Sequence, residues 1–148
     1  MIQFAQEPVQ DVMDEIKPLL EMHWREIAHY QDIELNPDWE FYQTNPAVRV
    51  FTARDNGILI GYGVFFIGPN RHYKQSIQAV QDILFIHPKY RGGRTGYRLI
   101  TFCDEQARAE GAQVIYHHTK IEHDFGALLE HIGYERVDFI YGHRLDKG

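Results

Sequence analysis

Apolar and polar residues alternate along several short runs of the chain, and this period of two is typical of β-strands with one buried face. Asp55-Asn56-Gly57 separates two of these runs and favours a tight hairpin, because Asn and Gly accept positive φ. The two runs should therefore be antiparallel neighbours in one sheet. The predicted strands cover residues 2–5, 48–54, 58–67, 76–86, 113–119 and, as a half-exposed last strand, 137–145.

Other segments repeat apolar residues every three or four positions, which is the period of an α-helix with one apolar face. The first of them covers residues 9–27 and contains Pro18, so we expect either a kink or two helices that meet near Lys17. A short helix should follow the capping sequence Asn36-Pro37-Asp38 and continue through Tyr42.

Two further helices are predicted in the second half of the chain. One has Leu99, Cys103 and Ala107 on the same face and should stop at Gly111. The other covers residues 125–132 and is followed by a glycine. The order of elements is strand, helices, a meander of three strands, helix, strand, helix and strand, which indicates a mixed α/β (α+β) protein.

Length and composition limit the alternatives. A chain of 148 residues can bury one core but is short for two, so residues 1–148 should form one domain. No apolar run has the length of a membrane span, and the N-terminus lacks the pattern of a signal peptide. We therefore expect a cytoplasmic protein without a membrane partner. Its single cysteine, Cys103, falls on the apolar face of a helix and is interpreted as core packing.

The charge of the chain is uneven. The net charge of −6 argues against nucleic acid as a partner. Residues 7–40 hold ten carboxylates against two basic residues, with aromatic side chains between them. Such a surface would attract a cationic amine by its field and by cation–π contacts. The alternative is a solvated helix face with the tryptophans packed beneath it.

Candidate chemistry concentrates in residues 82–111, where a strand, a glycine-rich turn and a helix follow one another. The first turn of a helix has free backbone N–H groups and a positive dipole end, so this arrangement suits a phosphate. The turn allows a ligand to approach the main chain and adds basic charge, which favours a diphosphate over an ordinary strand-to-helix connection. Its glycines are Gly92, Gly93 and Gly96, and its basic residues are Lys89, Arg91 and Arg94.

The spacing of these glycines matches neither a Walker loop nor a dinucleotide-binding fingerprint. The sequence L-F-I-H-P-K-Y-R-G-G-R-T-G instead resembles the acyl-CoA-binding segment of the GNAT superfamily of N-acyltransferases, with its pattern [QR]-x-x-G-x-[GA]. Arg91 occupies the first position and Gly96 the last, whereas Arg94 stands where a glycine is usual. Arg94 could narrow the loop and weaken binding, or contact a phosphate and strengthen it.

The resemblance extends over the order of elements and the closing L-L-E-H-I-G-Y-E-R-V. It implies a GNAT-like, mixed but mostly antiparallel sheet of about six to seven strands flanked by helices, with the fourth and fifth strands splayed apart. It also implies that acetyl-CoA is the co-substrate, with its pantetheine arm along the fourth strand and its diphosphate on the glycine loop. The cofactor-binding residues implied are Leu84, Phe85, Ile86, Arg91, Gly92, Gly93, Arg94, Thr95 and Gly96.

Acyl transfer to an amine needs a base that removes a proton. Asp82 lies where many members of the resembled family carry a glutamate, so it is the first candidate, although it could equally be a carboxylate at a sheet edge. His117 and His118 are the second candidates, because their pKa values are naturally near neutrality. As neighbours on a strand they face opposite sides, so only one of them can point at the thioester.

A tyrosine usually supplies the acid in the resembled family, but Leu129 occupies that position here. Tyr141, Tyr134 and Tyr116 remain candidate donors, and CoA thiolate can also leave without help. His117, His118 and His123 lack the spacing of a zinc site, so no metal is expected.

These observations predict an N-acetyltransferase that moves an acetyl group from acetyl-CoA to a primary amine by direct attack. The acceptor is either a small cationic molecule or a protein amine, and a homodimer through the last strands is common in the resembled family. The competing hypothesis is a degenerate member that binds acyl-CoA or a protein partner without turnover, motivated by Arg94 and Leu129.

Overall fold

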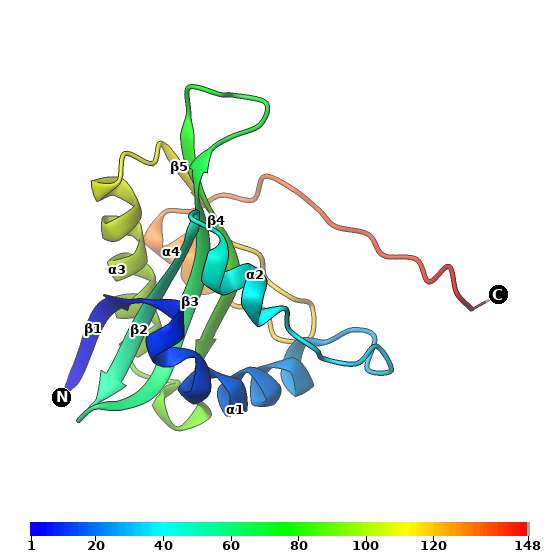
Figure 1. Cartoon of the computed structure of the whole chain (residues 1–148), viewed down its shortest axis with the longest axis horizontal. Helices are drawn as coiled ribbons and strands as arrows, with labels where there is room; N and C mark the ends of the chain where they lie inside the picture. Colours follow the sequence, from blue (N-terminus) through cyan, green and yellow to red (C-terminus); the bar gives the residue numbers. More distant parts are fainter. Residues whose placement is uncertain (148) are drawn as a thin grey trace.

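The computed structural model describes residues 1–147 as a five-stranded sheet with helices on both faces (Figure 1). The first four strands are antiparallel and follow chain order, and the fifth joins the fourth in parallel. The mixed, mostly antiparallel sheet is confirmed, but the predicted number of six to seven strands is wrong. The strands are β1 (Ile2–Glu7), β2 (Val48–Asp55), β3 (Ile58–Pro69), β4 (Ile77–Ile86) and β5 (Val114–Tyr116).

The helices lie close to their predicted positions. They are α1 (Val9–Ile27), α2 (Trp39–Thr44), α3 (Thr95–Ala109) and α4 (Gly126–Ile132), with a short 3₁₀ turn, η1 (Pro88–Tyr90), between β4 and α3. Pro18 lies inside a single helix α1, so the two-helix alternative is wrong. The side chain of Asp38 caps α2 by accepting a hydrogen bond from the Phe41 N–H group at 3.0 Å. The hairpin between β2 and β3 turns at Asn56 and Gly57, both with positive φ.

Each face of the sheet has its own apolar core, because alternate residues of a strand point to opposite faces. On one face, Leu99 of α3 packs against Phe51 and Phe65 of the sheet. On the other face, Val12 and Ile16 of α1 pack against Tyr62 and its neighbours on the sheet. Each fully buried large apolar side chain contributes about 1.5–3 kcal/mol of hydrophobic stabilisation. The two helices thus hold the sheet from opposite sides.

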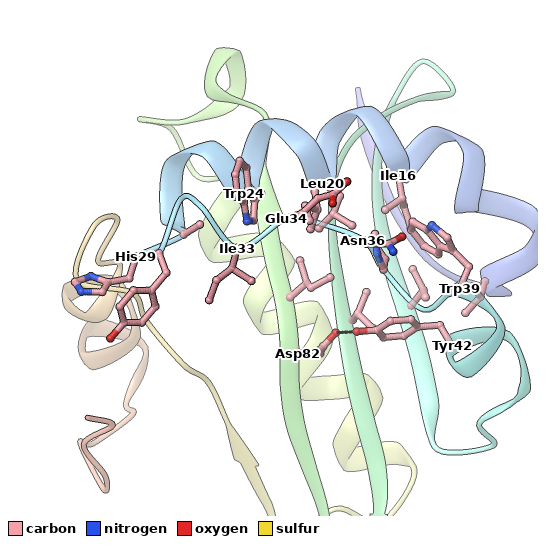
Figure 2. A pocket seen from close by; sticks show the side chains of 18 residues that line it. Ile16, Leu20, Trp24, His29, Ile33, Glu34, Asn36, Trp39, Tyr42 and Asp82 are labelled. Atoms are coloured by element: carbon pink, nitrogen blue, oxygen red, sulfur yellow. Dashed lines mark hydrogen bonds between the residues drawn. The ribbon is translucent and has the colours of Figure 1, made fainter. Parts of the chain in front are cut away.

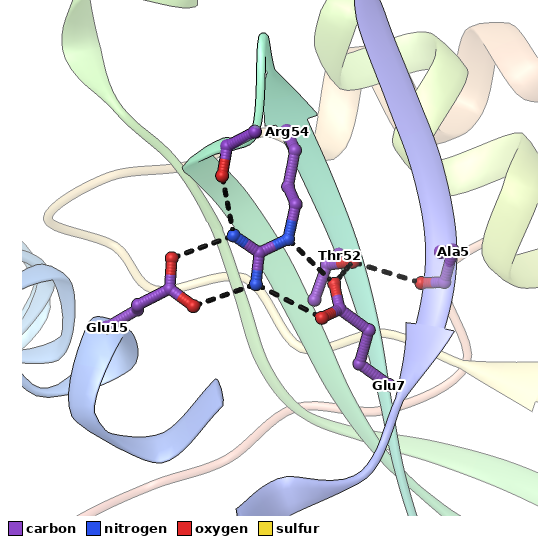
Figure 3. Close-up of polar contacts among 6 residues, drawn as sticks. Ala5, Glu7, Glu15, Thr52 and Arg54 are labelled. Carbon is purple, nitrogen blue, oxygen red and sulfur yellow. Dashed lines mark hydrogen bonds and ion pairs between the residues drawn. The ribbon is translucent and has the colours of Figure 1, made fainter. Parts of the chain in front are cut away.

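An ion-pair network fastens the start of α1 to the sheet (Figure 3). The guanidinium of Arg54 on β2 donates to both oxygens of Glu15 on α1 at 2.7 and 2.8 Å. It also donates to Glu7 at the end of β1 at 2.9 and 3.1 Å, and Thr52 donates a further bond to Glu7. Hydrogen bonds from Arg54 hold the pKa values of Glu7 and Glu15 below their usual range. Two of the acidic residues near the N-terminus are therefore structural.

A β-bulge interrupts the pairing of β3 and β4. Val64 pairs with Ile83 and Phe65 pairs with Gln81, so Asp82 is the extra residue of β4. A bulge rotates the side chains that follow it relative to those that precede it. As a result Asp82 and Ile83 both face the α1 side of the sheet, whereas Gln81 faces the α3 side.

The predicted last strand is absent from the part of the chain that the structure describes, because residues 134–147 form no strand. β5 is only three residues long, so it offers little edge for a sixth strand to pair with. Ile140, Tyr141 and Leu145 are exposed to solvent as the segment leaves the body of the molecule (Figure 1). Near its end, Arg144 donates to Asp32 at 2.8 Å, which ties the segment to the connection after α1.

The length and hydrophobicity of the helices can be compared with the needs of a membrane-spanning helix. Among residues 1–147, no helix is both long and apolar enough to cross a bilayer.

Candidate active site

A pocket of about 450 Å³ opens on the α1 face of the sheet, within the size range of small-molecule sites (Figure 2). Helix α1 forms one wall, and the connection between α1 and α2 together with α2 forms another. The floor is the sheet, where Val50, Val64, Asp82 and Ile83 lie side by side. We call this cavity the α1-face pocket.

Asp82 is the polar group on the floor of the α1-face pocket, and the bulge in β4 directs it there. The Tyr42 hydroxyl on α2 donates to Asp82 Oδ2 at 2.6 Å (Figure 2). Burial, together with the neighbouring Asp82 carboxylate, holds the pKa of Tyr42 above its usual range. Tyr42 therefore stays protonated and orients Asp82, which remains accessible from the pocket. The sequence analysis named Asp82 but missed Tyr42, since no local pattern links residues 40 positions apart.

Most of the acidic residues of the N-terminal region do not line the α1-face pocket. Glu34 is the one carboxylate of residues 7–40 among its lining residues. Others are held by basic partners, as Glu26 is by Arg91 and Asp32 is by Arg144. The expected acidic wall is therefore largely a set of ion pairs and solvated side chains, while its aromatic part, Trp24 and Trp39, does line the pocket.

The edge of β4 that faces β5 is open beyond the first few residues. β5 pairs with β4 at residues 78–80, so residues 81–86 extend past it and the two strands diverge where Asp82 lies. The His87 N–H group donates to the Ile60 carbonyl of β3 at 2.7 Å. Because bonding alternates along an antiparallel pair, Phe85 also bonds to β3, whereas Leu84 and Ile86 direct their main-chain groups to the open edge.

This alternation separates the predicted cofactor residues on β4. Leu84 presents main-chain groups that an extended ligand could pair with, as an added strand would. Ile86 presents its N–H group, since its carbonyl accepts from Arg91. Phe85 does not, since its side chain is buried under α1 and its main chain faces β3. The predicted splay of the fourth and fifth strands is present, with Asp82 at its apex.

The loop from residue 91 to the start of α3 presents unused hydrogen-bond donors. Within residues 1–147, none of the N–H groups of residues 92–97 donates to a main-chain acceptor, and α3 has no side-chain cap. Gly92 has a φ of +90°, a conformation that favours glycine. A Cβ atom added at Gly93 would have no protein atom within 4 Å beyond its chain neighbours. Free N–H groups at the positive end of a 15-residue helix form a suitable anion site.

The two arginines of this loop are engaged with the protein. Arg91 donates to both oxygens of Glu26 at 2.6 and 2.8 Å and to the Ile86 carbonyl at 2.8 Å, so it fastens the loop to the end of α1. Arg94 stacks on the ring of Tyr97, with 4.7 Å between its central carbon and the ring centre. Thr95 is buried at the first turn of α3, and Gly96 packs beside Leu128 of α4.

His117 and His118, the second candidates for the base, lie away from the α1-face pocket. His117 Nδ1 and the His118 N–H group both bond to Gln81 Oε1, at 2.8 and 3.0 Å, on the α3 side of the sheet. An amide oxygen accepts, so Nδ1 carries the proton and Nε2, which has no partner in residues 1–147, is the basic atom. Burial among aromatic rings lowers the pKa of His117 to about 4. The His118 side chain is exposed.

The tyrosines predicted as acids also lie apart from Asp82. Tyr141 is 91% exposed in the C-terminal segment and does not line the pocket. Tyr134 donates to Asp104 on α3, and Leu129, at the position of the usual acid, is buried and has no proton to give. The structure therefore brings together Asp82, the open edge of β4 and the glycine loop, but not His117, His118 or Tyr141.

Residues 11–134 match the family model described as the acetyltransferase (GNAT) family. The chain belongs to this family. Among curated proteins, none matches the chain by sequence. Membership confirms the resemblance drawn from the glycine loop, and it confirms at the level of the family that the protein is an N-acetyltransferase.

Solved structures share this fold over nearly the whole chain. A ribosomal-protein-alanine N-acetyltransferase from Brucella melitensis biovar Abortus 2308 has a TM-score of 0.75 at 20% identity and covers 98% of this chain and 99% of its own. The aminoglycoside N-acetyltransferase AAC(6')-Iy, in complex with CoA, has a TM-score of 0.71 at 15% identity, with 96% and 98% covered. A predicted acetyltransferase with acetyl-CoA from Clostridium acetobutylicum has a TM-score of 0.72 at 13% identity, with 100% and 99% covered.

The GNAT sheet also gives the site its layout. The glycine loop and the open edge of β4 form one continuous path that ends where β4 and β5 diverge. Asp82 stands at that end and faces the α1-face pocket. No group of three or more His, Cys, Asp or Glu side chains suited to a metal ion occurs within residues 1–147.

Proposed function

We propose that this GNAT protein transfers the acetyl group of acetyl-CoA to a primary amine held in the α1-face pocket. The observation that carries the proposal is the position of Asp82 at the junction of two features. On one side is the open edge of β4, and on the other is a pocket large enough for a small acceptor. Complexes of structural neighbours with CoA and acetyl-CoA support the choice of co-substrate.

In this mechanism the glycine loop binds the diphosphate of acetyl-CoA through the N–H groups of residues 92–97. The pantetheine arm pairs with the main-chain groups of Leu84 and the N–H group of Ile86. Asp82 removes a proton from the acceptor ammonium, and the neutral nitrogen attacks the thioester carbonyl. A main-chain N–H group of β4 stabilises the oxyanion. The C–S bond then breaks, CoA leaves as the thiolate, and the second amine proton passes to solvent.

Tyr42 has a supporting role in this proposal. Its hydroxyl donates to Asp82 Oδ2 and leaves Oδ1 for the acceptor. The absence of a proton donor at Leu129 means that the thiolate leaves without help from the usual position. The same feature motivates the second candidate, a module that binds acyl-CoA without turnover.

A binding and turnover experiment separates these possibilities. Calorimetry with CoA and acetyl-CoA tests the loop, and release of free thiol in the presence of candidate amines tests turnover. Tight binding without thiol release from any amine would favour the binding module. Absence of heat with both cofactors, on folded protein, would contradict both candidates.

Gly93→Glu is the variant that tests the loop most cleanly. Its Cβ atom has open space around it, so the fold should persist, while a carboxylate beside the diphosphate should lower the affinity for CoA at least tenfold, about 1.4 kcal/mol. Gly68→Glu, at another glycine with open space around it, is the matched control and should bind CoA normally. Gly96 is less suitable, because a side chain there would press on Leu128.

A further inference from the structure

The walls of the α1-face pocket are mainly apolar and aromatic. Trp24 and Trp39 flank the opening, and Ile33 of the connection between α1 and α2 leans over it, with 53% of its surface exposed (Figure 2). An exposed isoleucine beside two half-buried tryptophans is apolar surface that the protein itself leaves uncovered. The remaining aliphatic side chains of the lining are Val9, Ile16, Leu20, Ala28, Leu35, Pro37, Val50, Val64 and Ile83.

Charge in the pocket is sparse by comparison. Asp82 is the carboxylate on the floor, and Glu34 is the carboxylate on the connection at the rim. His29 also lines the pocket, but its Nδ1 lies 2.5 Å from Glu122, which occupies it. Asp82 on the floor can pair with one ammonium group of an acceptor.

An acceptor with three or more ammonium groups would lack partners in this pocket, because Asp82 and Glu34 are its two carboxylates. Each further ammonium group that enters among apolar side chains loses hydration without gaining a carboxylate. Three other acidic residues of the N-terminal region are held by arginines, Glu7 and Glu15 by Arg54 and Glu26 by Arg91. The pocket therefore disfavours acceptors with several cationic centres.

A flat apolar body suits the same walls. The indole rings of Trp24 and Trp39 and the ring of Tyr42 offer edges and faces for stacking with an aromatic group. Lys17 lies over Trp39, with its Nζ 5.7 Å from the ring centre. The acceptor's ring and the lysine need not compete, because an indole has two faces.

We propose that the acceptor is a small monoamine that carries an apolar, ring-containing body, with its nitrogen at Asp82 and its ring against the aromatic side chains of the pocket wall. This inference rests on the proposed function, since it names the acceptor class of the same site. It predicts a preference opposite to that of an enzyme for polycationic antibiotics. Peptide amines are the other outcome that the test distinguishes.

Binding can be measured without turnover, because Trp24 and Trp39 are the two tryptophans of the whole chain. Both tryptophans also line a neighbouring cavity that contains Glu21 and Asp32, so intrinsic fluorescence reports binding in either cavity, and the turnover comparison assigns it to the α1-face pocket. Titration of the protein, saturated with CoA, should show a saturable change with phenethylamine or tryptamine, the latter read at wavelengths beyond its own absorption. Kanamycin, spermidine and an alanine-terminated peptide should produce no saturable change at the same concentrations.

Turnover then tests the same preference. Thiol release with acetyl-CoA should give a kcat/KM for phenethylamine at least tenfold above that for kanamycin, spermidine or the peptide. Desolvation of one charged group without a partner costs enough free energy to produce a tenfold ratio. Ethanolamine, a monoamine without an apolar body, should also fall below phenethylamine. A higher kcat/KM for a polycation or for the peptide would overturn the inference and leave the proposed function standing.

Two variants sharpen the test. Trp39→Leu should lower kcat/KM for phenethylamine about tenfold, with little change for ethanolamine. Ile33→Asp adds a carboxylate at the rim, so it should raise the ratio of spermidine to phenethylamine turnover several-fold. Ile58→Asp, at an exposed isoleucine of the β2–β3 hairpin, is the matched control and should leave the ratio unchanged.

The outcomes keep the two proposals apart. Thiol release from no amine, together with saturable phenethylamine binding, would contradict the proposed function but support the pocket's chemistry. Thiol release without any preference for an apolar body, or unchanged preferences in Trp39→Leu and Ile33→Asp, would overturn the inference alone.

Discussion

Two tyrosine–aspartate pairs lie on opposite sides of the sheet, and their surroundings differ. Tyr42 donates to Asp82 in the α1-face pocket, where the carboxylate is exposed. Tyr134 donates to Asp104 between α3 and the segment after α4, where burial raises the pKa of Asp104. The bonded groups are the same in both pairs. The difference teaches that access, and not the identity of the side chains, makes Asp82 a candidate base.

The backbone explains why the two sides differ. On the α3 side, Phe65, Leu99 and Cys103 close the core completely. On the α1 side, the bulge in β4 turns Asp82 toward a region that α1 only partly covers. One extra residue in a strand therefore places a carboxylate in a pocket.

The largest expected effect comes from removing the accessible carboxylate. Asp82→Asn keeps an oxygen that can accept from Tyr42 but cannot take a proton, so kcat/KM should fall roughly 100- to 10,000-fold. Thermal unfolding and CoA affinity should stay close to wild type, because Asp82 is exposed. A decrease of less than about fivefold would remove Asp82 from the role of base.

The stability of the protein should depend on pH through His117, which lies on the closed α3 side of the sheet. Burial lowers the pKa of His117 to about 4, whereas the unfolded chain binds this proton near pH 6.5. Between these pH values the unfolded state binds more protons than the folded state, so the free energy of unfolding falls as the pH falls. The stability that neutral His117 contributes is therefore complete above pH 6.5 and is lost as the pH falls toward 4. One such group can cost up to about 3 kcal/mol.

Chemical denaturation of wild type and His117→Gln at pH 7.5 and 4.5 measures this loss. The variant should lose less stability between the two pH values, although His23, whose pKa is also lowered to about 4 by burial, contributes in both proteins. Equal losses in wild type and variant would show that His117 does not titrate as its surroundings require.

A smaller effect is expected from the partner of Asp82. Tyr42→Phe removes the hydrogen bond that orients the carboxylate but keeps the ring, so kcat should fall about three- to tenfold, near 1 kcal/mol. The KM for acetyl-CoA should not change. Steady-state kinetics at saturating acetyl-CoA provide the measurement, and a loss as large as that of Asp82→Asn would instead make Tyr42 part of the proton transfer.

The smallest effect is expected from the matching change on the closed side. Asp104→Asn retains an acceptor for Tyr134 and removes a carboxyl that burial already disfavours in its charged form. Turnover should stay within about twofold and stability within about 1 kcal/mol of wild type. The same assay as for Asp82→Asn checks this, and a similar loss of activity in both variants would erase the distinction between the two sides.

Much of the fold could be predicted from local patterns. The hairpin at Asn56 and Gly57, the helix stop at Gly111 and the cap at Asp38 each depend on nearby residues, and each was found. The last strand was predicted wrongly because alternation in residues 137–145 says nothing about a partner, and the short β5 offers little edge to pair with. Strand formation depends on its neighbours more than on its own sequence.

In the candidate site, too, local features could be predicted and long-range contacts could not. The glycine loop was proposed from a linear motif and Asp82 from its position in the resembled family, but the bulge that aims Asp82 depends on the pairing of β4 with β3. The ion pairs that occupy the N-terminal acidic residues could not be predicted either, since the partners of Glu26 and Asp32 lie 65 and 112 residues away. Local spacing could not reveal these long-range ion pairs.

The most direct test of the account is a crystal structure with a bisubstrate compound that joins CoA to an acceptor amine through the acetyl group. The account predicts its diphosphate on the N–H groups of residues 92–97, its arm along Leu84 and Ile86, and its amide nitrogen within reach of Asp82, directly or through one water. A compound bound with that nitrogen on the His117 side of the sheet, and with the α1-face pocket empty, would contradict it.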